Sequence, residues 1–119
     1  MERIINAFRN SGRAWAHLIR SETAFKQEII VLALALPVAW FIAESWLMWL
    51  VLIGMVVMVL VVEVLNTGIE AACNAVSREF SADIRIAKDC GSLAVLLACS
   101  IGSLVWLFAI IEAIFRWTS

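Results

Sequence analysis

The sequence predicts an all-α membrane protein, with an N-terminal amphipathic helix at the membrane interface and three helices that cross the bilayer. Of its 119 residues, 64% are hydrophobic and 16% are charged, whereas soluble domains are roughly 45–50% apolar and about 25% charged. One proline and five glycines leave few turns, so most of the chain must lie in long elements. This composition excludes a disordered chain, a disulfide scaffold and a multidomain soluble enzyme.

Residues 3–20 have the pattern of a helix that lies flat in the membrane interface. At about 100° per residue, the apolar side chains of this segment fall within one arc; they are Ile4, Ile5, Phe8, Trp15, Leu18 and Ile19. The opposite face carries arginines, asparagines and the single histidine, His17. A basic polar face opposite Trp and Phe is typical of interfacial helices. We therefore expect a surface helix, with packing on a soluble partner as the alternative.

Three runs without a charged residue follow, at Ile29–Ala43, Ser45–Val62 and Cys90–Ile111. A helix needs about 20 predominantly apolar residues to cross a bilayer, and flanking polar residues can lengthen such runs because long side chains reach the head groups. We expect a very short hairpin at Glu44 and one membrane domain over residues 1–119. The predicted transmembrane helices lie at about 26–43, 45–70 and 88–115.

The positions of Lys and Arg predict the orientation in the membrane. Residues 1–28 hold five of them, the hairpin at Glu44 holds none, and residues 66–89 hold three. The excess of positive charge on cytosolic segments places the N-terminus and the second connection in the cytosol. The C-terminus then lies outside. Tryptophans flank the outer ends of the spans, as aromatic belts do; they are Trp40, Trp46, Trp49 and Trp117.

A polar stripe on the second span is the strongest indication of a functional site. Glu63 ends an apolar run, and Asn66, Glu70 and Asn74 follow on the same helical face, which we expect to point inward. Ionisable side chains at membrane depth are costly and usually mark a site. A carboxylate at this position suits a general base. The alternative is a stripe of interhelical hydrogen bonds that holds an oligomer together.

Other charged residues, expected at a depth in the membrane similar to that of Glu70, supply the groups that phosphoryl transfer needs. Glu22 precedes the first span, while Lys88 and Asp89 open the third. Mg²⁺ is commonly bound by one or two carboxylates together with substrate phosphates, and Lys offsets phosphate charge. The glycine-rich phosphate loops of soluble kinases are absent from the sequence.

Three blocks of sequence resemble the bacterial integral membrane diacylglycerol kinases. The segment Glu63–Glu70, Glu-Val-Leu-Asn-Thr-Gly-Ile-Glu, is similar to the signature of that family. Glu22–Glu28 before the first span and Ala87–Ser92 at the start of the third extend the resemblance over nearly the whole chain. Gly68 stands where the family usually has Ser or Ala, Cys73-Asn74 replaces Val-Asp, and Phe80-Ser81 replaces Tyr-His.

The resemblance implies ATP-dependent phosphorylation of diacylglycerol to phosphatidic acid at the cytosolic face of the bacterial inner membrane. It also implies a homotrimer, active sites shared between subunits, and Mg²⁺ as the cation. Glu63 matches the general base and Asn66 the asparagine that orients the catalytic groups, while Glu22 and Glu70 match the metal-binding glutamates.

The resemblance also assigns two sets of binding positions. The ATP-binding positions are Arg3, Asn10, Glu22, Glu70, Glu79, Phe80, Ser81, Lys88 and Asp89. The lipid-binding positions are Arg3, Ala24, Phe25, Lys26, Gln27, Glu28, Glu63, Ser92 and Trp106.

Three other functions compete with this interpretation. Undecaprenol kinases share the signature and phosphorylate a long polyprenyl alcohol. The identity of the lipid substrate therefore rests on the resemblance. A small multidrug transporter would need four spans and a carboxylate near the bilayer midplane, whereas this sequence has three spans with its carboxylates at one face. A non-catalytic membrane subunit is the third possibility.

Overall fold

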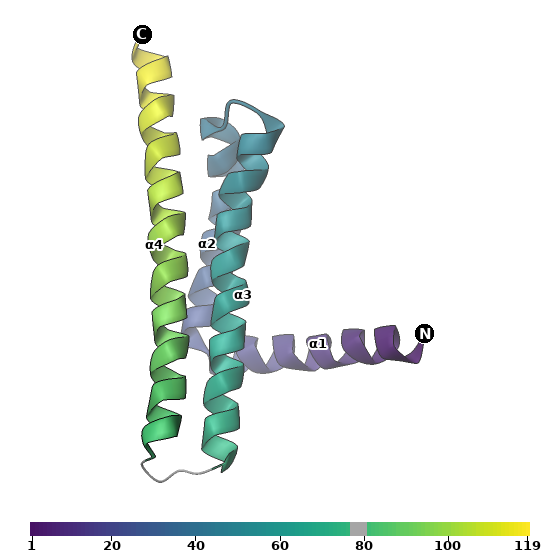
Figure 1. Cartoon of the computed structure of the whole chain (residues 1–119). Coiled ribbons are helices and arrows are strands. Elements are labelled where there is room, and N and C mark those ends of the chain that lie inside the picture. Colours follow the sequence, from purple (N-terminus) through teal and green to yellow (C-terminus); the bar gives the residue numbers. More distant parts are fainter. Residues whose placement is uncertain (77–80) are drawn as a thin grey trace.

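The computed structural model describes residues 1–76 and 81–119, which fold into four helices (Figure 1). These are α1 (Glu2–Ser21), α2 (Thr23–Ile42), α3 (Trp46–Val76) and α4 (Ala82–Thr118). The last three are long and apolar enough to cross a membrane. The predicted fold class is thereby confirmed.

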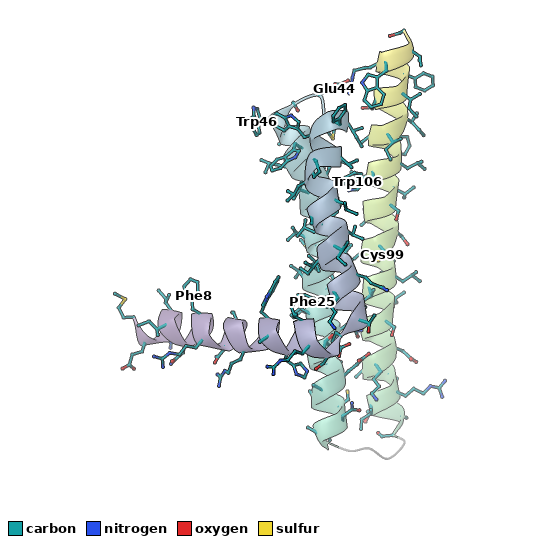
Figure 2. All side chains as sticks on the ribbon, turned by 180° about the vertical axis from the view of Figure 1, so that it is seen from behind. Phe8, Phe25, Glu44, Trp46, Cys99 and Trp106 are labelled. Carbon is teal, nitrogen blue, oxygen red and sulfur yellow. The ribbon has the colours of Figure 1, made fainter. Side chains whose placement is uncertain are left out.

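Helix α1 runs crosswise to the bundle of α2, α3 and α4, with the N-terminus at its free end (Figure 1). Leu18 is the buried residue of this helix, and most of its other apolar side chains are exposed. Phe8 is 76% exposed and extends to the side of α1 on which the bundle continues toward Glu44 and Trp46 (Figure 2). The helix therefore turns an uncovered apolar surface toward the region that a bilayer around the bundle would occupy.

A small hydrophobic cluster fixes α1 to the bundle. Leu18 of α1, Phe25 of α2 and Leu60 of α3 are buried together, and Trp15 stacks edge-to-face on Phe25 with ring centroids 5.3 Å apart. Between the two helices, Glu22 adopts an extended backbone conformation, and its N–H donates to the carbonyl of Leu18. The position of Glu22 is thus set by apolar packing on both sides of it.

Within the bundle, α3 is the central helix, because it packs against both α2 and α4 while those two touch each other little. The buried residues of α4 are all small, which lets α3 approach closely; they are Gly91, Gly102, Ala109 and Ala113. Trp106 adds a hydrogen bond from its ring N–H to the carbonyl of Leu52, at 3.0 Å.

The two ends of the bundle differ in construction. We call the end that carries the connection between α2 and α3 the hairpin end, and the opposite end the α1 end. At the α1 end, α3 and α4 continue past the level of α1 (Figure 1). Because α2 begins at Thr23 near the joint with α1, the last turns of α3 extend beyond α2 and have α4 beside them (Figure 1).

Candidate active site

Four glutamates gather where α1, α2 and α3 meet. Glu22 lies at the junction of α1 and α2, Glu28 lies on α2, and Glu63 and Glu70 lie on α3. Glu22, Glu28 and Glu70 are all close enough to Glu63 for their charges to act on it. Glu63 follows the buried Leu60 by about one turn and is itself half-buried. The hydrophobic joint therefore places a carboxylate at the boundary between apolar packing and a negatively charged cluster.

Two polar oxygens in this region are buried without a hydrogen-bond partner among the described residues. They are Oε2 of Glu28 and Oδ1 of Asn66. Buried polar atoms are nearly always paired in folded proteins, so each exception calls for an explanation. Since both atoms lie beside the carboxylate cluster, we interpret them as acceptors that a substrate or water satisfies.

Asn66 owes its place to a close approach of α4. The side chain of Asn66 lies directly against Gly91, which is buried in the contact between α3 and α4. Thr67, the next residue, donates its hydroxyl to the carbonyl of Glu63 at 3.0 Å. The signature segment is therefore held both along α3 and across to α4.

Lys88 contacts α3 beyond Asn66. Its Nζ donates to Oδ1 of Asn74 at 3.1 Å, and this acceptor carries no charge. On the exposed side of α4, Asp89 lies 3.9 Å from Arg85, which is a loose surface pair of little energetic weight. Lys88 is thus positioned without being neutralised by its partner.

An apolar groove of about 430 Å³ leads away from this cluster between α2 and α4, with α3 as its floor. Glu28 lines one end of the groove and Trp106 the other, and Cys99 lies between them on α4. Figure 2 shows Cys99 and Trp106 along the same side of α4. The groove therefore connects the membrane interior to a carboxylate with an unpaired oxygen.

Some predicted site residues lie far from the cluster within one chain. At about 1.5 Å per residue along a helix, Arg3 is about 28 Å and Asn10 about 18 Å from Glu22, and the N-terminal half of α1 extends away from the bundle (Figure 1). Trp106 lies at the far end of the groove from Glu28.

The other predicted positions divide between packed, exposed and undescribed residues. Phe25 is 2% exposed and belongs to the core at the joint, whereas Ser81 precedes α4 as its N-cap residue. Ala24, Lys26, Gln27 and Ser92 are exposed. Glu79 and Phe80 lie outside the described residues.

The polar stripe on α3 differs in part from the sequence expectation. Glu63 and Asn66 are half-buried, but Glu70 and Asn74 are exposed. The cause is the position of α2, which begins at Thr23 and so cannot cover the last turns of α3. The sequence expectation also gave no role to Gly91 or to the contact between Asn74 and Lys88. For Gly91, the one signal available in the sequence was a glycine within a long predicted helix.

The donor set suits a divalent cation that arrives with a substrate. Among the described residues, no group of three or more His, Cys, Asp or Glu side chains is arranged to hold a metal ion. Glu22 and Glu70 nevertheless supply hard carboxylate oxygens beside the same cluster. Mg²⁺ usually takes one or two carboxylates and completes its shell with waters and substrate phosphates, so this pair fits such an ion.

Taken together, the fold and the site describe a protein of membrane-spanning helices, with carboxylates, an amide and a lysine at the end of an apolar groove. A sequence profile described as prokaryotic diacylglycerol kinase matches residues 9–110. The chain belongs to the prokaryotic diacylglycerol kinase family.

Several bacterial proteins named diacylglycerol kinase are similar to this chain over most of its length. The Escherichia coli K12 protein is 35% identical over 107 residues, which cover 87% of this chain and 85% of that protein. The Pseudomonas aeruginosa protein is 32% identical over 106 residues, covering 89% and 86%. The Haemophilus influenzae protein is 28% identical over 103 residues, covering 87% of each. The chain is accordingly a bacterial membrane protein of a kinase family.

Proposed function

We propose that residues 1–119 act as one membrane kinase domain that transfers the γ-phosphoryl group of ATP to the hydroxyl of diacylglycerol, giving phosphatidic acid. The observation that carries this proposal is the junction of the apolar groove with the carboxylate cluster around Glu28 and Glu63. A lipid alcohol in the groove would present its hydroxyl to these carboxylates. The names of the relatives in several bacteria support diacylglycerol as that lipid.

The α1 end of the bundle faces the cytosol in this proposal. Arginines on α1 and Lys26 at the start of α2 supply the positive charge that favours the cytosolic side. The apolar face of α1 lies in the interface, with Phe8 and Trp15 toward the lipid. ATP, which is confined to the cytosol, then reaches the carboxylate cluster from the same side, while the C-terminus lies outside.

Glu63 is the general base of the proposed reaction. The lipid hydroxyl oxygen forms a bond to the γ-phosphorus while the bond from that phosphorus to the bridging oxygen of ADP breaks. The hydroxyl proton passes to the carboxylate of Glu63, and ADP leaves with the bridging oxygen. Proton acceptance of this kind contributes typically about 10²–10⁴-fold. The remainder of the catalysis is positioning and charge stabilisation, since the transition state of phosphoryl transfer is loose.

Asn66 and Lys88 would hold the reacting groups in place. Asn66 lies about one turn beyond Glu63 and keeps a buried acceptor oxygen without a partner, which suits an orienting hydrogen bond to the substrate or to a bound water. Lys88, whose charge Asn74 does not neutralise, would contact the nucleotide phosphates. Asp89 on the same turn of α4 would contact the nucleotide as well.

Glu22 and Glu70 would hold Mg²⁺, the proposed cation. When bound, the cation offsets the negative charge of the phosphates. The two glutamates would place the cation at the mouth of the cluster, because the charges of both act on Glu63. Without the ion, the same carboxylates repel the phosphates.

The distant residues of α1 point to a site shared between copies of the chain. Arg3 and Asn10 lie far from Glu22 of their own chain, on a helix that extends away from the bundle (Figure 1). We propose a homotrimer in which they contact the ATP or lipid of a neighbouring copy. Glu79, Phe80 and Ser81 complete the proposed ATP positions. Ala24 to Glu28, Ser92 and Trp106 are the proposed lipid positions.

A phosphotransfer assay tests the proposed function. The purified protein in mixed micelles receives ATP labelled on its γ-phosphate, Mg²⁺, and either diacylglycerol or undecaprenol. We expect labelled phosphatidic acid, and the Glu63→Gln variant serves as the control for contaminating kinases. Faster transfer to undecaprenol would reassign the substrate, and no transfer to either lipid by assembled protein would contradict the proposed function.

A further inference from the structure

Gly91 of α4 lies directly against the side chain of Asn66 of α3. A Cβ atom built on Gly91 would overlap Oδ1 of Asn66 and would lie 3.1 Å from Cγ of the same side chain. The third nearest atom is Cβ of Asn66, so the obstruction is this one side chain. The space that a side chain at position 91 would need is the space that the amide of Asn66 occupies.

The other glycines of the membrane helices make no such contact. Cβ atoms built on Gly54 and Gly68 meet nothing within 4 Å, and one on Gly102 meets Met55 and Val59 at 3.8–3.9 Å, an ordinary contact distance. Glycine within a helix costs about 1 kcal/mol relative to alanine. Gly91 carries this cost at a position that faces a polar side chain of the proposed active site, Asn66.

We propose that Gly91 is a positioning residue for Asn66, a role that rests on the proposed function of Asn66 as the group that orients the reactants. Without a side chain at position 91, the amide of Asn66 lies flat against α4, and its Oδ1 is buried yet unpaired among the described residues. The wall of α4 limits the rotamers of Asn66. The same wall keeps its acceptor oxygen buried rather than turned toward solvent.

Substitution of Gly91 by alanine would push this amide out of place. A misplacement of about 1 Å at a catalytic group can cost about 10²-fold in rate. The loss should fall on kcat, with the KM values for ATP and lipid little changed, because Asn66 would act on the reacting atoms. A purely structural role of Gly91 in helix packing would instead lower stability and act independently of Asn66.

A double-mutant cycle separates these two roles. The variants are Gly91→Ala, Asn66→Ala and the double variant, with Gly68→Ala as the matched control, since a methyl group at position 68 meets nothing within 4 Å. Phosphotransfer kinetics and thermal stability are measured for each protein in mixed micelles.

We expect Gly91→Ala to lower kcat by up to about 10²-fold, toward the value of Asn66→Ala, and the double variant to be no slower than Asn66→Ala. If Gly91→Ala does not assemble, assembly of the double variant with the activity of Asn66→Ala supports the proposal, and failure of both overturns it. The proposal is also overturned if Gly91→Ala lowers kcat by the same factor in the unmodified protein and in Asn66→Ala. Nearly full activity of Gly91→Ala overturns it as well. Full activity of Asn66→Ala would contradict the proposed function of Asn66 instead.

Discussion

At the hairpin end of the bundle, polar side chains are paired within the chain. Arg116 donates to the carboxylate of Glu44 at 2.6 Å and to the carbonyl of Ile42 at 2.7 Å, and the ring N–H of Trp49 donates to the carbonyl of Leu36. At the α1 end, by contrast, glutamates face one another, and Glu28 and Asn66 keep buried oxygens without partners among the described residues.

This difference indicates that the hairpin end contributes to stability, whereas the α1 end carries the proposed chemistry. A paired polar group contributes modestly to stability, whereas an unpaired buried one carries a cost of desolvation that a ligand can relieve. The chain therefore closes its hairpin end with internal contacts and keeps unpaired polar atoms at the α1 end, where the proposed substrates would bind. Substitutions at the α1 end should therefore act mainly on activity, and substitutions at the hairpin end mainly on stability.

The largest effect should come from Glu63→Gln. The amide keeps the shape of the side chain but accepts a proton poorly, so kcat should fall by about 10²–10⁴-fold. The KM values should change little, because the carboxylate acts in the transition state rather than in binding. Assembly should survive, since removal of a half-buried charge from a membrane helix relieves a cost. Near-full turnover by an assembled variant would leave Glu63 as a packing residue.

A second effect concerns the cation. In Glu70→Gln, a hard anionic ligand is lost, so the Mg²⁺ concentration for half-maximal activity should rise by at least about tenfold, as with losses around metal sites generally. Titration of activity with Mg²⁺ measures this shift. The matched control is Glu112→Gln, an exposed glutamate near the C-terminal end of α4, which should titrate like the unmodified protein. An unchanged Mg²⁺ dependence in Glu70→Gln would reassign the metal role.

A smaller effect should follow from Asn74→Asp. The new carboxylate would pair with Lys88 and compete with the nucleotide for its charge. An exposed ion pair is worth about 0.2–1 kcal/mol, so KM for ATP should rise by up to about fivefold, with KM for the lipid unchanged. Asn74→Ser is the neutral control. If Asn74→Asp binds ATP as well as Asn74→Ser does, Lys88 does not contact the phosphates.

The smallest effect should come from Glu44→Gln at the hairpin end. The pair with Arg116 is largely exposed on the Glu44 side, and such pairs contribute about 0.2–1 kcal/mol. The variant should lose that much stability toward unfolding in detergent and retain its phosphotransfer rate. A large loss of rate with normal stability would show that the two ends are not independent.

The sequence was sufficient for the fold class, because uncharged runs and the separation of charges are properties of the chain alone. It also predicted that Glu22 and Glu70 lie at a similar depth, and in the structure the charges of both act on Glu63. It could not show that Gly91 faces Asn66, since that contact depends on the register of α3 against α4. Nor could it show that Glu70 and Asn74 are uncovered, which depends on where α2 begins.

In the proposed orientation, the crosswise helix α1 would also fix the depth in the bilayer at which the reaction takes place. Because α1 runs crosswise to the bundle and is fixed to α2 and α3 through Leu18, Phe25 and Leu60, this joint would set the distance from the membrane surface to Glu63, whatever the length of the spans. A thicker or thinner bilayer changes how far the hairpin end is covered, and helices adjust to such mismatch by tilting or by local deformation of the lipid. In the proposed orientation, the carboxylate of Glu63 would stay at the level of the lipid head groups in either case.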